Sequence, residues 1–91
     1  MTIWKYPLKV TDIQNVEMPA GARVLSAHVQ RDTICVWVLA DPAADRVRRQ
    51  FRIFGTGVPV GEIPMAEFVA TVHFLRVGLV FHVFDYGEVP S

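Results

Sequence analysis

The densest group of side chains able to do chemistry is a run of four arginines within seven residues. They are Arg46, Arg48, Arg49 and Arg52. A guanidinium group offers a planar fork of N–H donors that matches carboxylate and phosphate oxygens, so this run favours an anion site. In an extended strand, three of the four share one face, whereas Arg49 breaks the alternation and suggests a β-bulge. The alternative is a solvated outer strand whose charges protect a sheet edge.

A short turn with two glycines follows the arginine run. The glycines of the segment Gly55-Thr56-Gly57 would let backbone N–H groups approach an anion closely, with the threonine hydroxyl as a further donor. No lysine of a phosphate-binding loop and no clear helix follows, so an ordinary turn at the end of a strand competes with this interpretation. Aromatic rings able to stack on a planar ligand complete the set. The candidate ligand-binding residues are Arg48, Arg52, Phe54, Gly55, Thr56, Gly57 and Trp37.

The histidines and the single cysteine offer weaker chemistry. His73 and His82 on neighbouring strands would place two ring nitrogens on one metal ion, with His28 as a third ligand. Histidine ring nitrogens form hydrogen bonds with hydroxyls or backbone groups more often than they bind a metal. A single strand cysteine such as Cys35 is most often a small buried hydrophobic residue. No Ser/His/Asp order and no pair of carboxylates indicates hydrolysis. We therefore expect no metal, no cofactor and no catalytic residue.

These side chains must be positioned by strands. Short runs rich in β-branched and aromatic residues recur with a period of two, which predicts an all-β, mainly antiparallel fold. A small barrel or sandwich of about six to seven strands would leave the fewest exposed edges. At most one short helix is expected, in 41–46 or 62–68, where a proline can occupy the first turn. The predicted strands span 2–8, 13–18, 22–30, 33–40, 46–54, 67–76 and 79–85.

Two hairpins follow from the gaps between these runs. A two-residue turn at 31–32 places Ala27 opposite Val36 and Leu25 opposite Val38 on the core side. A second two-residue turn at 77–78, with a glycine for the positive φ, places Phe74 opposite Phe81 and Val72 opposite Val83. It also brings His73 opposite His82 on the other side of the sheet.

Length and composition limit the classes of protein and partner. A chain of 91 residues is expected to form one domain over 1–91. Nine basic and nine acidic residues cancel, which argues against nucleic acid and membranes as partners. A hydrophobic share of 52% is high for this size and predicts apolar surface in a homo-oligomer interface or a pocket. With no signal peptide, no membrane span and one cysteine, a cytoplasmic location is expected.

Several short segments resemble one known group of proteins. The segments are 4–8 (WKYPL), 18–22 (MPAGA), 41–42 (DP), 51–57 (FRIFGTG) and 82–84 (HVF). Together they are similar to a family of short uncharacterised proteins encoded mainly by bacteriophages and prophages. The resemblance spans nearly the whole chain and implies a phage accessory role in the host cytoplasm, by analogy of gene context. It carries over no site residue.

Two functions remain open at this point. The first is a non-enzymatic, homo-oligomeric binder of a small anionic ligand, plausibly a nucleotide signal of host defence, in a pocket created at a subunit interface. The second is an interaction module that inhibits a host protein or serves a structural role in the phage, by strand addition. A small hydrolase using the histidines fits less well, because no nucleophile and base stand at a recognisable spacing.

Overall fold

Seven strands make up the fold, and no helix is present in the residues that the computed structural model describes, 1–61 and 66–90. The seven predicted strands are confirmed, and the largest change at their ends extends the last one from residue 85 to 89. Residues 41–45 form a turn rather than a helix, closed by the amide of Ala44 donating to the carbonyl of Asp41 at 3.0 Å. Of the other helix candidate, 62–65 lie outside the described residues. The strands are β1 (Thr2–Leu8), β2 (Ile13–Pro19), β3 (Arg23–Gln30), β4 (Thr33–Ala40), β5 (Arg46–Gly55), β6 (Glu67–Phe74) and β7 (Leu79–Val89).

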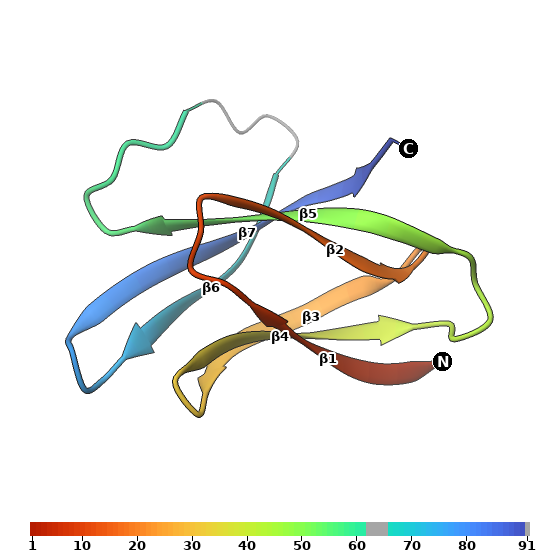
Figure 1. Cartoon of the computed structure of the whole chain (residues 1–91), viewed down its shortest axis with the longest axis horizontal. Helices are drawn as coiled ribbons and strands as arrows, with labels where there is room; N and C mark the ends of the chain where they lie inside the picture. The colour runs from red at the N-terminus through yellow and green to blue at the C-terminus, as the bar shows by residue number, and fades with distance from the viewer. Residues whose placement is uncertain (62–65, 91) are drawn as a thin grey trace.

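The strands form two antiparallel sheets. One has the order β1-β4-β3 and the other β2-β5-β7-β6. Figure 1 shows β1, β4 and β3 below β2 and β5, with the β6–β7 hairpin reaching out at the left. The sheets approach each other where β3 contacts β6, but β1 and β2 do not pair, so the fold is a sandwich and not a closed barrel. In the described ranges, no helix is long and apolar enough to cross a membrane.

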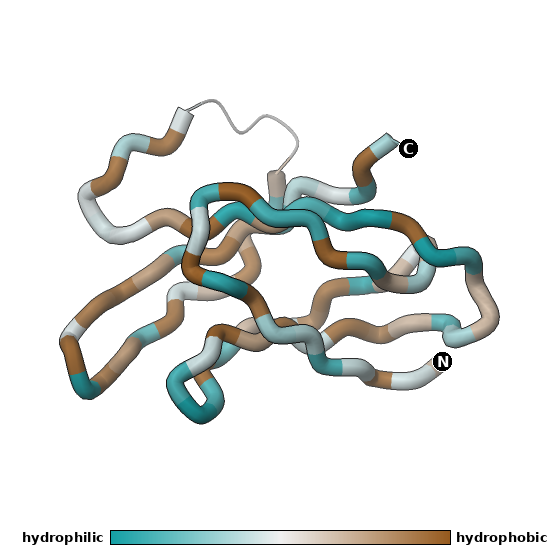
Figure 2. Tube along the Cα trace, in the orientation of Figure 1, coloured by the Kyte–Doolittle hydropathy of each residue, from teal (hydrophilic) through white to brown (hydrophobic). Residues whose placement is uncertain are grey.

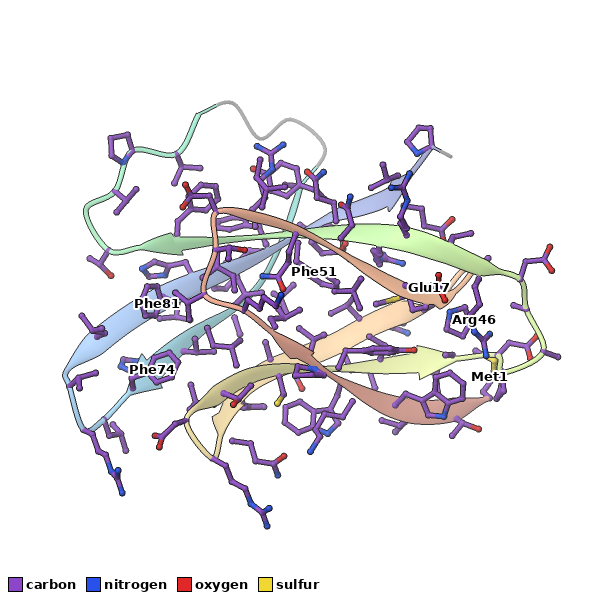
Figure 3. All side chains as sticks on the ribbon, viewed as in Figure 1. Met1, Glu17, Arg46, Phe51, Phe74 and Phe81 are labelled. Carbon is purple, nitrogen blue, oxygen red and sulfur yellow. The ribbon has the colours of Figure 1, made fainter. Side chains whose placement is uncertain are left out.

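The core lies between the two sheets and is built from the inward-facing residues, which alternate with outward-facing ones along each strand. Phe51 is the largest fully buried side chain, and Figure 3 shows it between the layers. Because a strand alternates its side chains, each buried residue leaves its neighbours on the outer face of the same strand. The buried cluster consists of Leu8, Met18, Ala22, Ala27, Ile34, Val36, Val38, Ala40, Phe51, Ile53, Val72 and Val83.

The β3–β4 hairpin turns at 31–32, as predicted. Both turn residues have positive φ, 51° and 61°, which is the geometry of a turn whose twist matches that of the flanking strands. Ala27 pairs with Val36, as predicted, but the pairing shifts between Val24 and Ser26. The predicted pair of Leu25 and Val38 is therefore wrong, because a β-bulge gives that place to Val24 and leaves Leu25 44% exposed.

The β6–β7 hairpin has a longer loop than predicted. Phe74 pairs with Leu79, and the loop closes when the amide of Gly78, which has φ +66°, donates to the carbonyl of Phe74 at 2.9 Å. Loop length sets hairpin register, so a four-residue connection moves every predicted pair by two residues. The predicted pairs of Phe74 with Phe81, Val72 with Val83 and His73 with His82 are wrong. The structure pairs Val72 with Phe81, Ala70 with Val83, His73 with Val80 and Thr71 with His82.

Candidate functional site

Alternation along β5 separates its buried side chains from its charged ones. Phe51 and Ile53 are buried in the core, and Arg48 and Arg52 lie on the outer face of the β2-β5-β7-β6 sheet, as predicted. β5 is an interior strand, paired with β2 on one side and β7 on the other. Its arginines therefore stand on a sheet face and not at a sheet edge, so edge protection is excluded, and a solvated outer face is the alternative to an anion site.

Arg49 faces the opposite way from these two arginines and is held by an acid. Its Nε and Nη2 donate to the two carboxylate oxygens of Asp85 at 3.0 and 2.8 Å, and its Nη1 donates to the carbonyl of Ala22 at 2.6 Å. The side chains are 15% and 5% exposed. No bulge occurs at Arg49. The extra residue is Tyr86 in β7, because Gln50 pairs with Gly87 and the next residue of β5 pairs with Asp85.

The pairing of Arg49 with Asp85 has two consequences for the candidate site. The charge of Arg49 is neutralised inside the sandwich, so this arginine is not available to a ligand. Asp85 was not singled out by the sequence analysis. The signal that could have found it is an acid at an inward position of a strand, between Phe84 and Tyr86, where an unpaired carboxylate would be costly.

The bulge in β7 places an aromatic ring under Arg52. The guanidinium carbon of Arg52 lies 4.2 Å from the ring centroid of Tyr86. Its Nε donates to the side-chain oxygen of Gln50 at 3.0 Å. The ring and the amide fix the plane of the guanidinium group, while its two terminal nitrogens have no partner among the described residues. A planar, oriented donor pair is the form in which arginine binds phosphate or carboxylate oxygens.

Three phenylalanines continue this face beside Arg52. Phe84 pairs with Arg52 across the strands and meets Phe54 and Phe68 edge to face, at centroid distances of 5.8 and 5.6 Å. Phe68 is 58% exposed although it stands in a sheet. We call this face the arginine–aromatic surface, and it is formed by Arg48, Arg52, Phe54, Phe68, Phe84 and Tyr86.

Arg48 borders a shallow depression at one end of this surface. The depression has a volume of about 310 Å³ and is lined by Glu17, Arg46, Arg48 and two valines; Figure 3 labels Glu17 and Arg46 beside each other. Arg46 is held by the carbonyls of Pro42 and Ala44 at 3.2 and 2.9 Å. Arg48 pairs with Glu17 in the backbone register, yet no ion pair within 4.0 Å joins their side chains or holds Arg48 to another described residue.

The segment Gly55-Thr56-Gly57 forms a turn at the opposite end of β5. The amide of Thr56 donates to the carbonyl of Val80 at 3.3 Å, and the Thr56 hydroxyl contacts His82 Nε2 at 2.8 Å. The hydroxyl of Thr71 contacts the other ring nitrogen of His82 at 2.9 Å. Gly55 is seven steps along the strand from Arg48, about 23 Å at 3.3 Å per residue. One small ligand therefore cannot reach both ends.

Trp37 lies on the other sheet. It pairs with Ser26 on the outer face of β1-β4-β3 and meets His28 edge to face at 5.7 Å. Trp37 therefore does not join the arginine–aromatic surface. Cys35 is buried and His28, His73 and His82 do not converge, and no group of three potential metal ligands occurs in the described part of the chain. The structure thus places Arg48, Arg52 and Phe54 on one face of β5, puts the glycine turn at the end of that strand next to Phe54, and leaves Trp37 on the other sheet.

Comparison with known proteins places the chain in one family. Residues 1–90 match the domain of unknown function DUF7352, and the chain therefore belongs to this family. No curated protein and no solved structure gives a significant match.

Proposed function

We propose that this member of the DUF7352 family is a non-enzymatic, homo-oligomeric binding protein that holds a small anionic ligand on the arginine–aromatic surface. The observation that carries the proposal is the division of the arginine run. Asp85 neutralises Arg49, whereas Arg48 and Arg52 stand on one outer face with no ion pair to a described residue. Guanidinium groups on one face that have no ion-pair partner within 4.0 Å in the described ranges favour an anionic partner.

The aromatic residues narrow the class of ligand. Phe84 and Tyr86 lie beside Arg52, and Phe68 lies on the far side of Phe84. Aromatic rings accept planar rings in stacked or edge-to-face contacts. A ligand with phosphate groups for the arginines and a planar base for the phenylalanines is a nucleotide. The overall charge balance of the chain favours a small nucleotide over a long nucleic acid.

The proposal includes the absence of catalysis. The surroundings of His82 and Cys35, the side chains best suited to act as a base or a nucleophile, support this part of it. Both ring nitrogens of His82 contact threonine hydroxyls. A hydroxyl both donates and accepts, so Thr71 does not fix the tautomer of His82 as a carboxylate would. The thiol of Cys35 is buried. Neither group is arranged as an activated base or nucleophile.

The resemblance to phage-encoded proteins extends the proposal to a biological role. A small protein that binds nucleotides without converting them would lower the free concentration of a nucleotide signal. In an infected cell, such binding would counter a host defence that depends on that signal. The resemblance and the chemistry of the surface together support this proposed role.

The proposal is tested by the small molecules that the protein retains. The protein is purified from cells, denatured, and the released small molecules are identified by mass spectrometry. We expect a nucleotide from the wild type and its loss from Arg48→Gln and Arg52→Gln. Arg23→Gln is the matched control, because Arg23 is an exposed arginine of the other sheet. A nucleotide retained equally by all variants would place the site elsewhere, and no nucleotide at all would contradict the proposal.

A second candidate function is supported by the outer face of the β1-β4-β3 sheet. Ile3 and Leu25 are 58% and 44% exposed there, beside Trp37 and Leu39. An apolar sheet face of this kind fits a protein partner. A polypeptide that co-purifies with the wild type and is lost from Trp37→Ser would favour this interaction module over the nucleotide binder.

A further inference from the structure

The loop of the β6–β7 hairpin exposes large apolar side chains. Leu75 is 90% exposed, Val77 65% and Leu79 52%. Figure 2 shows this hairpin as mostly hydrophobic, with a hydrophilic stretch at its tip and shorter hydrophilic segments along its strands. Hairpin loops are usually built from Gly, Asn, Asp, Ser and Pro, so three apolar side chains at one tip indicate a contact surface.

A hollow lies beside this tip, toward the β3–β4 turn. It has a volume of about 340 Å³, and its lining includes Val29, Phe74 and the turn residues Arg31 and Asp32. Leu75 is also one of the residues that line it. A protruding apolar side chain and a partly apolar hollow therefore occur together at the same end of the molecule, where two copies of the chain can present them to each other.

The charges at this end are of both signs. Arg76 Nη1 lies 4.0 Å from Asp32 Oδ2, and the two side chains are 86% and 72% exposed. A contact this long and this open leaves both groups free to pair with other partners. In a twofold arrangement, a residue that contacts a second residue of the other copy is contacted in return. A contact between Arg76 of one copy and Asp32 of the other would therefore occur twice.

We propose that this hairpin end, formed by Asp32, Leu75, Arg76, Val77 and Leu79, binds a second copy of the chain in a symmetric dimer. Leu75 of each copy is directed toward the hollow of the other, and two pairs of Arg76 with Asp32 cross the interface. This inference names the surface through which the proposed homo-oligomer forms. It rests on the homo-oligomer part of the proposed function and not on ligand binding. The interface lies apart from Arg48 and the depression beside it.

The other exposed apolar surface is less suited to self-association. Around Ile3 and Trp37, the outer face of the β1-β4-β3 sheet carries Lys5, Arg23 and His28, and the described residues of this face include no acid. Two copies joined there would bring like charges together without a compensating acid. The hairpin end carries Arg31 and Arg76 beside Asp32, so an acid is present to pair with an arginine across a twofold axis.

Two charge reversals test the dimer. Arg76→Asp and Asp32→Arg each place like charges at both contacts, and both residues are exposed, so the fold is retained. Arginine at position 32 has to adopt the left-handed backbone conformation, which Arg31 already adopts next to it at a modest cost in stability. Sedimentation velocity over a concentration series should show a dimer for the wild type and a dissociation constant raised about tenfold or more for each variant. Circular dichroism confirms folding.

An equimolar mixture of the two variants gives the decisive result. In the mixture, the substituted positions of one chain face opposite charges on the other, so a mixed dimer should form with wild-type affinity. Pairing within one chain cannot produce this result. A monomeric wild type, unimpaired single variants or a mixture that stays monomeric would each overturn the proposal. Arg48→Gln should dimerise like the wild type, so failure of the dimer and failure of nucleotide binding are separate outcomes.

Discussion

Arg49 and Arg48 are adjacent residues with different roles. Arg49 makes a bidentate pair with Asp85 inside the sandwich, and Arg48 has no ion pair among the described residues. Arg49→Ala leaves a buried carboxylate without its partner and should lower the free energy of unfolding by about 3 kcal/mol. Arg48→Ala should change it by less than about 0.5 kcal/mol. Urea unfolding of both variants measures the difference, and equal effects would contradict the assignment of roles.

Tyr6 supplies a pH dependence of stability at the residue scale. Burial raises the pKa of the Tyr6 hydroxyl above its ordinary value of 10.0, and the charge of Arg46 opposes this shift only in part. A folded-state pKa above the unfolded one gives stability that is complete below about pH 10 and is lost as the pH rises through the folded value.

Replacing Tyr6 with phenylalanine removes this titration while it keeps the ring. We expect Tyr6→Phe to lose less stability than the wild type between about pH 8 and about pH 11, because its ring cannot ionise. Denaturant unfolding at the two pH values gives the comparison. An identical loss in both proteins would show that other groups account for the alkaline destabilisation.

At the scale of elements, the two-residue turn of the β3–β4 hairpin lowers the stability of the fold, because its residues adopt a strained backbone conformation. Arg31 has a φ of 51°, a conformation that asparagine adopts more readily than arginine. Arg31→Asn should therefore raise the free energy of unfolding by about 0.5 to 1 kcal/mol. Arg31→Val, with a branched Cβ, should lower it. Thermal unfolding of both variants provides the measurement, and a destabilised Arg31→Asn would mean that the arginine side chain makes a stabilising contact.

The strands could be predicted from the sequence because their periodicity is a local property. Alternation of apolar and polar residues located all seven strands and placed Arg48 and Arg52 on one face. Register was predicted only where the loop length was correct. The β3–β4 turn has the predicted two residues, whereas the β6–β7 loop has four, which moved His73 away from His82.

Other features depended on residues distant in sequence and were missed. A charged residue at the inward position of Arg49 suggested a bulge. Nothing near it in the chain reveals that Asp85, 36 residues away, pairs with it in the core. Trp37 was grouped with the arginines on residue type alone, and sheet order decided its place. The bulges at Leu25 and Tyr86 likewise arise from pairing between strands, which the alternation within one strand does not specify.

At the scale of the whole molecule, the sandwich offers surfaces with different chemistry. The arginine–aromatic surface lies on the outer face of one sheet, and the apolar face with Trp37 lies on the outer face of the other. The hairpin end lies at the loops of β3–β4 and β6–β7. Because the proposed dimer contact lies at the loops, each copy would keep its arginine–aromatic surface open, and a dimer would carry two equivalent ligand sites.

The central claim is that Arg48 and Arg52 bind the phosphate groups of a nucleotide. Isothermal titration with the nucleotide released from the purified protein should give an affinity that falls about 10- to 100-fold in Arg52→Ala, the range for a charged hydrogen bond of about 1.5 to 3 kcal/mol. Arg52→Lys should recover only part of it, because lysine lacks the planar fork. Unchanged affinity in Arg52→Ala, together with a lowered melting temperature, would contradict the claim and make Arg52 a structural partner of Tyr86.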